Sequence, residues 1–186
     1  MTLATADQRG NPWASPVWYA TADYREFIWV SSTEARHSRN IAVPPELGIV
    51  IFDSHQRPGA GEAVYVSARA GQVPDHDLDR CLDIFSTTSQ RQRLPAWNRE
   101  DVRSPARLRL YHATASEHYL LSSTDERIPV VLASQRAGDP IRPHLKQAAS
   151  SPSLYRKVVT RFAAARVHPG SPRRENQEPT YDAKGR

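Results

Sequence analysis

Hydrophobic and polar positions alternate along most of the first 132 residues, in short runs that turn residues separate. Alternation with a period of two, interrupted by clusters of Gly, Pro, Asn and Asp, is typical of β-strands joined by hairpins. The run over 47–53 is almost wholly apolar, which predicts a strand buried on both faces. We predict strands over the following ranges: 1–6, 12–22, 26–32, 47–53, 62–73, 107–121 and 128–132.

Two segments have helical spacing instead. The first covers residues 35–43 and follows Ser32 and Thr33, one of which we expect to be its N-cap. The second covers the apolar positions between 78 and 85, where Leu and Phe recur at intervals of three and four. Short strands with few helices favour an antiparallel barrel over a doubly wound sheet. We therefore predict a mainly β protein, with a split antiparallel β-barrel domain over residues 1–132.

Residues 133–186 differ in composition from the rest of the chain. The formal net charge of +5 divides unevenly, because residues 1–133 carry 14 Lys/Arg and 16 Asp/Glu (net −2), whereas residues 134–186 carry 11 and 4 (net +7). We predict a basic, partly disordered tail rich in Pro, Arg and Ser, with an amphipathic helix over 153–167. Its charge supports only weak, non-specific contact, so we expect no specific nucleic-acid partner.

Standard catalytic and metal signatures are missing from the sequence. It has no phosphate-binding glycine loop, no nucleophile elbow and no paired cysteines at metal-ligand spacing. His112 and His118 lie six apart, which predicts one strand face but supplies no third ligand, so we expect no metal. The lone Cys81 cannot form an internal disulfide, and no apolar run is long enough to span a membrane; both favour a cytoplasmic protein without a membrane partner.

One polar run stands out after the third strand: Ser31, Ser32, Thr33, Arg36, His37, Ser38, Arg39 and Asn40. Hydroxyls at a strand end, free N–H groups at a helix start and one or two guanidiniums suit a phosphate group. The same residue types also occur in an ordinary capped surface helix with solvated arginines. The residues alone leave both interpretations open.

Residues 1–132 resemble the FMN-binding split barrel of pyridoxamine 5'-phosphate oxidase-like proteins. The likeness is strongest before residue 73, and the stretch from Arg109 to Tyr119 resembles the closing strand of part of that family. It rests on an ordered series of segments: 5–12 (Thr-Ala-Asp-Gln-Arg-Gly-Asn-Pro), 14–19 (Ala-Ser-Pro-Val-Trp-Tyr), 28–32 (Ile-Trp-Val-Ser-Ser), 35–37 (Ala-Arg-His), 40–41 (Asn-Ile), Pro45 and 64–70 (Val-Tyr-Val-Ser-Ala-Arg-Ala).

The resemblance implies a set of cofactor-binding residues. His37 stands where the family often has lysine, and its conditional charge predicts a weaker or pH-dependent hold on phosphate. The resemblance also suggests Trp97 and Arg109 as candidates to reach the flavin from a second subunit, and plain packing of a loop is the alternative for Trp97. The remaining residues divide into a ring group (Ser15, Pro16, Val17 and Trp18) and a phosphate group (Ser31, Ser32, Arg36, His37 and Asn40).

The resemblance further implies a homodimeric, FMN-dependent oxidoreductase that acts on a small organic substrate. An F420-binding reductase of the same fold, or a non-catalytic flavin- or haem-binding module, remain alternatives. No side chain is assigned a catalytic role, because the flavin itself supplies the redox chemistry. The substrate-binding pattern of true pyridoxamine phosphate oxidases is not visible, so vitamin B6 oxidation is not predicted. Family members usually have a short helix before the first strand, so we expect part of the barrel's cover to be absent or supplied by a partner.

Overall fold

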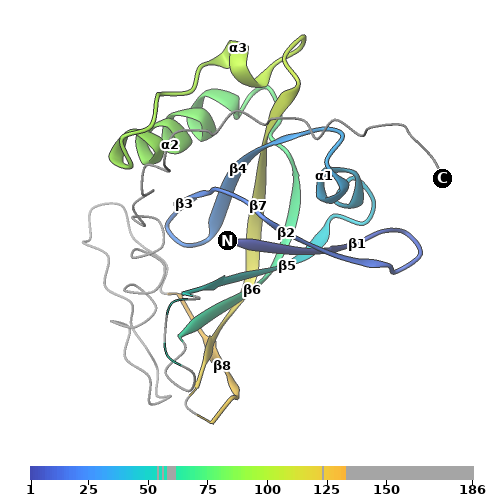
Figure 1. The fold of residues 1–186 in the computed structure, drawn as a ribbon, viewed down its shortest axis with the longest axis vertical. Helices are drawn as coiled ribbons and strands as arrows, with labels where there is room; N and C mark the ends of the chain where they lie inside the picture. Colours follow the sequence, from blue (N-terminus) through green and yellow to red (C-terminus); the bar gives the residue numbers. More distant parts are fainter. Residues whose placement is uncertain (54, 56, 58–61, 123, 133–186) are drawn as a thin grey trace, which may run out of the picture.

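The computed structural model describes residues 1–53, 55, 57, 62–122 and 124–132 (Figure 1). The predicted tail over 133–186, including its helix over 153–167, lies outside the described residues. In the described part no helix is long and apolar enough to cross a membrane. The elements follow in the order β1 (Thr2–Ala6), β2 (Pro12–Pro16), β3 (Ala20–Ala22), β4 (Glu26–Ser32), α1 (Arg36–Asn40), β5 (Glu46–Phe52), β6 (Ala63–Gln72), α2 (Leu78–Arg91), α3 (Arg99–Val102), β7 (Leu108–Leu121) and β8 (Arg127–Val130).

The strands form one antiparallel sheet in the order β2-β1-β5-β6-β7-β4-β3, with β8 paired to β7. The two end strands of this order, β2 and β3, are consecutive along the chain and are joined by residues 17–19 alone. The sheet therefore curls round on itself (Figure 1), yet no strand pairing joins β2 to β3 among the described residues. We call this open line between β2 and the β3–β4 pair the seam. The prediction of a mainly β, split antiparallel barrel is confirmed.

Two hydrophobic cores lie on the two faces of the sheet. In β4, Phe27 and Trp29 face the inside of the barrel, where Trp29 stacks on Tyr111 of β7 with ring centroids 5.8 Å apart. Ile28 of the same strand faces outward and packs against α2, together with Leu110 of β7. Alternation with a period of two thus places successive residues of one strand in different cores. Burial of both sets fixes the register of β4 against β7.

Several sequence predictions need correction. The single strand expected over 12–22 is two strands, separated by residues 17–19, of which Val17 still exchanges backbone hydrogen bonds with Met1. The strand expected to be buried on both faces, β5, is buried only on alternate residues; its Ile49 and Ile51 are buried, whereas Phe52 is 51% exposed. The apolar run over 47–53 therefore forms a strand with only one fully buried face.

The helix predicted over 35–43 is shorter than expected. It covers only Arg36–Asn40, and its N-cap is Ala35, which supplies no side-chain cap. Neither expected cap, Ser32 or Thr33, occupies that position, and Ser32 instead accepts a hydrogen bond from the backbone N–H of Glu34 at 3.1 Å. The hydroxyl thus stabilises the turn before the helix rather than the first turn of the helix.

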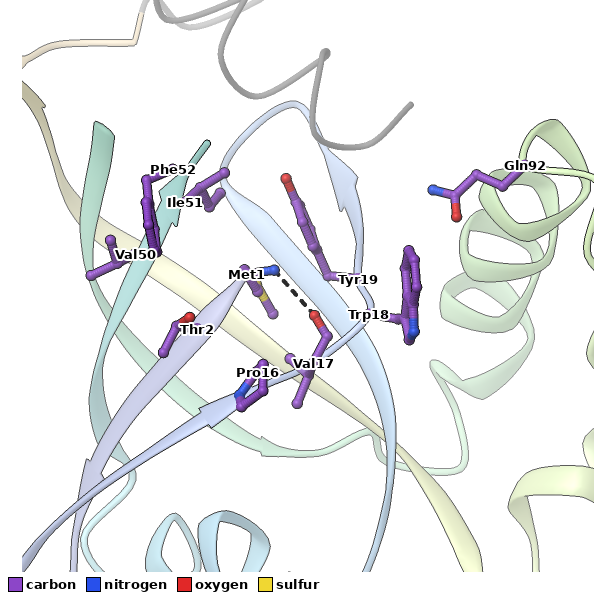
Figure 2. Close-up of a pocket in the computed structure, with 10 residues that line it drawn as sticks. All are labelled: Met1, Thr2, Pro16, Val17, Trp18, Tyr19, Val50, Ile51, Phe52 and Gln92. Atoms are coloured by element: carbon purple, nitrogen blue, oxygen red, sulfur yellow. Dashed lines mark hydrogen bonds between the residues drawn. The ribbon is translucent and has the colours of Figure 1, made fainter. Parts of the chain in front are cut away.

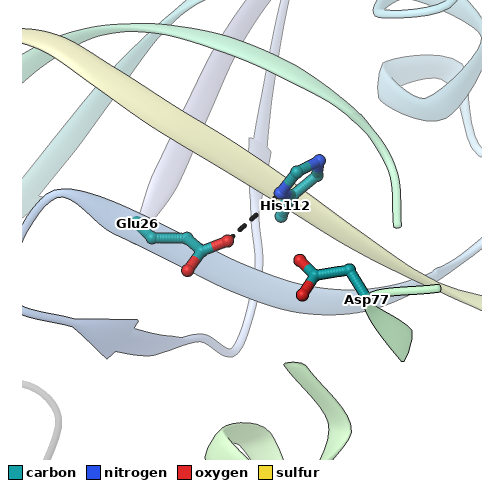
Figure 3. A group of neighbouring side chains, drawn as sticks. All are labelled: Glu26, Asp77 and His112. Carbon is teal, nitrogen blue, oxygen red and sulfur yellow. Dashed lines mark hydrogen bonds and ion pairs between the residues drawn. The ribbon is translucent and has the colours of Figure 1, made fainter. Parts of the chain in front are cut away.

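Helix α2 is attached to the sheet by a charged network as well as by its apolar face. The guanidinium of Arg80 donates to both carboxylate oxygens of Glu26 in β4 at 2.8 Å, and to Asp77 at 2.6 Å. His112 of β7 lies 3.2 Å from the same Glu26 carboxylate (Figure 3). The hydrogen bonds from Arg80 lower the pKa of Glu26, and they lower the pKa of Asp77 to about 2.

Replacing Arg80 by Gln is expected to destabilise the protein by roughly 1–2 kcal/mol at pH 7, since Arg80 is half exposed and solvent screens its pairs. The pKa values of both carboxyls are lower in the folded state, so this stabilisation is complete above the unfolded value near 4 and is lost as pH falls toward 2. Urea unfolding should show the difference between wild type and Arg80→Gln shrinking below pH 4. Arg103→Gln, which breaks an exposed pair with Asp75, is the control. An undiminished difference at pH 2.5 would contradict this account.

Candidate functional site

A pocket with a volume of about 480 Å³ opens at one end of the barrel, beside residues 17–19 (Figure 2). Its rim carries two large exposed side chains, Trp18 (58% exposed) and Phe52 (51% exposed). Figure 2 shows them on opposite sides, with the ring of Tyr19 between them. We call this the aromatic pocket; it is lined by Met1, Thr2, Pro16, Val17, Trp18, Tyr19, Val50, Ile51, Phe52 and Gln92.

Three of the four residues predicted to lie against a flavin ring line this pocket, namely Pro16, Val17 and Trp18. Sequence reasoning missed the walls that β1 and β5 contribute. A signal was available in Phe52, a large aromatic residue at a position of β5 where the alternation leaves the side chain outside the core. The hydroxyl of Tyr19 is buried in an otherwise apolar surrounding without a hydrogen-bond partner in the described part of the chain, and burial raises its pKa.

The polar run after β4 forms a cluster around the buried ring of His37. One ring nitrogen, Nε2, lies 2.8 Å from the Ser31 hydroxyl at the end of β4, and the other, Nδ1, lies 3.1 Å from the Ser15 hydroxyl in β2. A neutral imidazole donates from one nitrogen and accepts at the other, and a serine hydroxyl can serve either. Both nitrogens of His37 therefore have partners inside the protein. We call Ser15, Ser31, Ser32, Arg36 and His37 the polar cluster.

Arg36 is the exposed cation of the cluster. Its guanidinium lies 4.5 Å from the centroid of the Trp13 ring in β2, in a cation–π contact. Within the described residues it forms no hydrogen bond or ion pair, whereas Arg39 on the same helix is paired with Glu34. Its N–H groups can therefore bind an anion without breaking an internal bond.

Asn40 does not lie on the helix surface. It is buried, and its amide donates to the Thr5 hydroxyl at 3.0 Å, so it joins α1 to β1. The five-residue α1 is too short to supply a strong helix dipole. An anion held here would consequently depend on Arg36 and on hydroxyl groups.

The two residues expected to act across a dimer lie in different surroundings. Trp97 packs edge-on against Phe85 of α2, with ring centroids 5.7 Å apart. Arg109 lies directly opposite Ser31 in the β4–β7 register, and its Nη1 donates to the carbonyl oxygens of Ala106 and Leu108. Directly opposed residues have Cβ atoms about 5 Å apart on one sheet face, so Arg109 begins beside the polar cluster of its own chain.

A second group of ionisable residues was not foreseen from the sequence. Glu26, Asp77 and His112 bring three ligand-type atoms within 4.8 Å of one another (Figure 3). Arg80 already donates to both carboxylates, so the group is a charge network that anchors α2. Burial raises the pKa of the neighbouring Cys81 thiol to about 12, which keeps it protonated and unreactive at neutral pH.

The prediction that His112 and His118 share a strand face is wrong. The register of β6 with β7 shifts between Ser67 and Ala68, which leaves Ser116 as an extra residue in β7. Such a bulge exchanges the two faces for the residues that follow it. His112 therefore lies on the α2 side, whereas His118 is buried and hydrogen-bonds to the Tyr24 carbonyl at 2.7 Å.

Burial lowers the pKa of His37, so we expect its ring to be neutral at pH 7. The unfolded chain binds this proton at a higher pH than the folded protein does, so stability should rise with pH up to about 6.5 and fall on acidification below it. NMR of the imidazole resonances would show His37 titrating below pH 6.5. His118, whose pKa is also lowered mainly by burial, should do the same. A His37 ring that is charged at pH 7 would contradict this prediction.

Comparison with known proteins agrees with this geometry. The strands form one eight-stranded antiparallel sheet that curls into a split barrel. The family model of pyridoxamine 5'-phosphate oxidase matches residues 1–122, and the chain belongs to that family. The sequence-based assignment to this family is confirmed. A pyridoxine/pyridoxamine 5'-phosphate oxidase from Anaeromyxobacter dehalogenans is 30% identical over 95 residues, which cover 51% of this chain and 44% of that enzyme.

Solved structures show the same fold at low identity. A heme binding protein from Mycobacterium smegmatis has a TM-score of 0.55 and 20% identity, covering 69% of this chain and 51% of that one. HutZ, the heme storage protein from Vibrio cholerae, has a TM-score of 0.51 and 18% identity, covering 64% and 83%. The chain spans about half the length of the first of these proteins and less than half of the curated oxidase.

Proposed function

We propose that the protein binds FMN and acts as a flavin-dependent oxidoreductase on a small organic substrate. The observation that carries this proposal is the continuity of the two halves of the site. Ser15 belongs to the polar cluster, and the next residues, Pro16 to Trp18, line the aromatic pocket. A ligand with an anionic end and a flat apolar end suits such a pair of adjacent surfaces, and FMN has both.

The polar cluster fits the phosphate end. Arg36 supplies an exposed guanidinium held by the Trp13 ring, and the hydroxyls of Ser31 and Ser32 are within the same short segment. Guanidinium and hydroxyl groups are the usual donors to phosphate oxygens. Because Arg36 forms no hydrogen bond or ion pair in the described part of the chain, phosphate binding would break none, and the contact with the Trp13 ring can stay in place. Asn40 and His37, both buried and hydrogen-bonded, would support this end from beneath.

The aromatic pocket fits the ring end. Its volume of about 480 Å³ falls within the range of small-molecule sites. Its walls are mainly apolar, and Trp18 and Phe52 offer flat faces for stacking. A bound flavin would supply the hydride or electron transfer at its ring. The chain's own contribution is to hold the phosphate, to orient the ring along Pro16–Trp18, and to exclude water from one side of it.

Related cofactors define the competing proposals. A deazaflavin such as F420 has the same flat ring and an anionic tail, so the same surfaces would suit it. A non-catalytic flavin- or haem-binding module is the second alternative, since two proteins of this fold are described as heme proteins. Within the described residues, the aromatic pocket has no histidine among its lining, which favours a flavin over an imidazole-ligated haem.

Titration of the purified protein with FMN, riboflavin, F420 and haem, followed by absorbance and flavin fluorescence, tests the proposal. FMN is expected to bind. Arg36→Ala should weaken FMN binding roughly tenfold to a hundredfold by removing charge-assisted hydrogen bonds, and should leave riboflavin binding unchanged because riboflavin has no phosphate. Adding Ser32→Ala should weaken FMN binding further.

Arg39→Ala is the matched control, because Arg39 lies on the same helix but is paired with Glu34. It should change FMN affinity by less than about twofold, as expected for an exposed pair. A protein that takes up neither FMN nor F420 would overturn the proposed function. FMN binding that survives Arg36→Ala with Ser32→Ala would reject the phosphate site alone.

We further propose that the protein is a homodimer in solution. Two exposed aromatic residues stand at the pocket rim: Trp18 follows the edge strand β2, and Phe52 ends β5. Apolar rims and open sheet edges are the surfaces that association covers. A second subunit would also bring further side chains to the open side of the pocket, which is how Trp97 could contribute.

Light scattering after size-exclusion chromatography should give twice the mass of one chain. The double variant Trp18→Ser with Phe52→Ser should shift the protein toward the monomer, because it removes the largest exposed apolar side chains of the rim. Val131→Ser, at a 74% exposed position away from the pocket, should leave the mass unchanged. A monomeric wild type at micromolar concentration would refute the dimer.

A further inference from the structure

His37 crosses the seam of the barrel. Its two hydrogen-bond partners belong to strands that lie far apart in the sheet order, because Ser15 is in edge strand β2 and Ser31 is in β4, next to the opposite edge. No backbone ladder joins these strands in the described part of the chain. The imidazole ring therefore makes, through side chains, a connection that the sheet itself does not make.

The two ends of this connection are the two ends of the proposed cofactor site. Ser15 immediately precedes the ring-contacting residues Pro16 to Trp18, and Ser31 immediately precedes Ser32 in the phosphate group. The distance between ring end and phosphate end is thus set, at this point, by one bridging side chain. Ser15 and His37 are both more than nine-tenths buried, so water does not compete for the Ser15 bond.

We propose that His37 is a positioning residue that holds the ring-binding segment of β2 at a fixed distance from the phosphate-binding end of β4, and does not itself bind the phosphate. This inference rests on the proposed flavin site for its functional part. It replaces the expectation that His37 substitutes for a phosphate-binding lysine. For His37 to bind a phosphate, one of its two serine bonds would have to break, whereas Arg36 can bind without breaking any bond to the described residues.

Comparison of FMN with riboflavin separates positioning from phosphate contact. We call the bridge from His37 to Ser15 and Ser31 the clamp. Both ligands contact the ring-binding segment that the clamp holds in place, so we expect His37→Gln and Ser15→Ala each to weaken both ligands about five- to tenfold, which corresponds to the loss of one hydrogen bond. The double variant should be no weaker than His37→Gln alone, because both changes break the same connection. Loss of FMN affinity with riboflavin affinity unchanged would overturn the proposal and make His37 a phosphate ligand.

His37→Lys gives a second discrimination. A lysine restores a permanent charge but cannot bridge two hydroxyls through opposite sides of a ring. The positioning role predicts weaker binding of both FMN and riboflavin to this variant. Tighter FMN binding with unchanged riboflavin binding would contradict it.

Thermal unfolding of the ligand-free protein tests, without any flavin, whether Ser15 and His37 stabilise the fold through one shared connection. Ser15→Ala and His37→Gln should each lower Tm by about 3–5 °C, and the double variant should lower it by no more than the larger single change. Additive effects would overturn the clamp. Ser89→Ala, a buried serine of α2 bonded to the Phe85 carbonyl, is the control; it should lower Tm without changing flavin affinity. If wild type binds no flavin while the Tm effects are non-additive, the proposed function fails and the clamp stands.

Discussion

The two edge strands of the curled sheet share no backbone ladder in the described part of the chain, and the hydrogen bonds of His37 with Ser15 and Ser31 bridge that opening. Neighbouring contacts work in the same direction, since Asn40 joins α1 to β1 through Thr5. Through its buried side chains His37 and Asn40, the short α1 contacts three strands, β1, β2 and β4. Its placement decides where the pocket and the exposed Arg36 lie relative to each other.

Much of this arrangement could be predicted from the sequence, because strand alternation and turn residues are local signals. The strands and the barrel were foreseen on that basis, whereas the family was foreseen from the resemblance of an ordered series of segments. The clamp was not, because nothing in the sequence tells a solvated histidine from a buried one that bridges residues 15 and 31. The anchoring of α2 was missed for the same reason: Arg80, Asp77 and Glu26 meet only after β4 and the helix pack together.

The errors in the prediction also have local physical causes. Residues 17–19 divide what the hydrophobic pattern presents as one strand, and Phe52 makes a half-exposed strand look fully buried. The polar run after β4 contained two kinds of residue that composition could not separate. Arg36 and Ser32 face outward or toward a turn, whereas His37 and Asn40 lie inside and use their polar atoms within the protein.

The bulge at Ser116 reverses which face of the sheet the even-numbered residues of β7 occupy. On the α3 side of it, even-numbered positions such as Leu110 and His112 serve the layer under α2; beyond it, even-numbered positions such as His118 and Leu120 point into the barrel. Two substitutions of the same kind, both at even positions of one strand, would consequently disturb different halves of the molecule. The substitutions that an even-numbered position of β7 tolerates should therefore depend on packing against α2 before Ser116 and on packing inside the barrel after it.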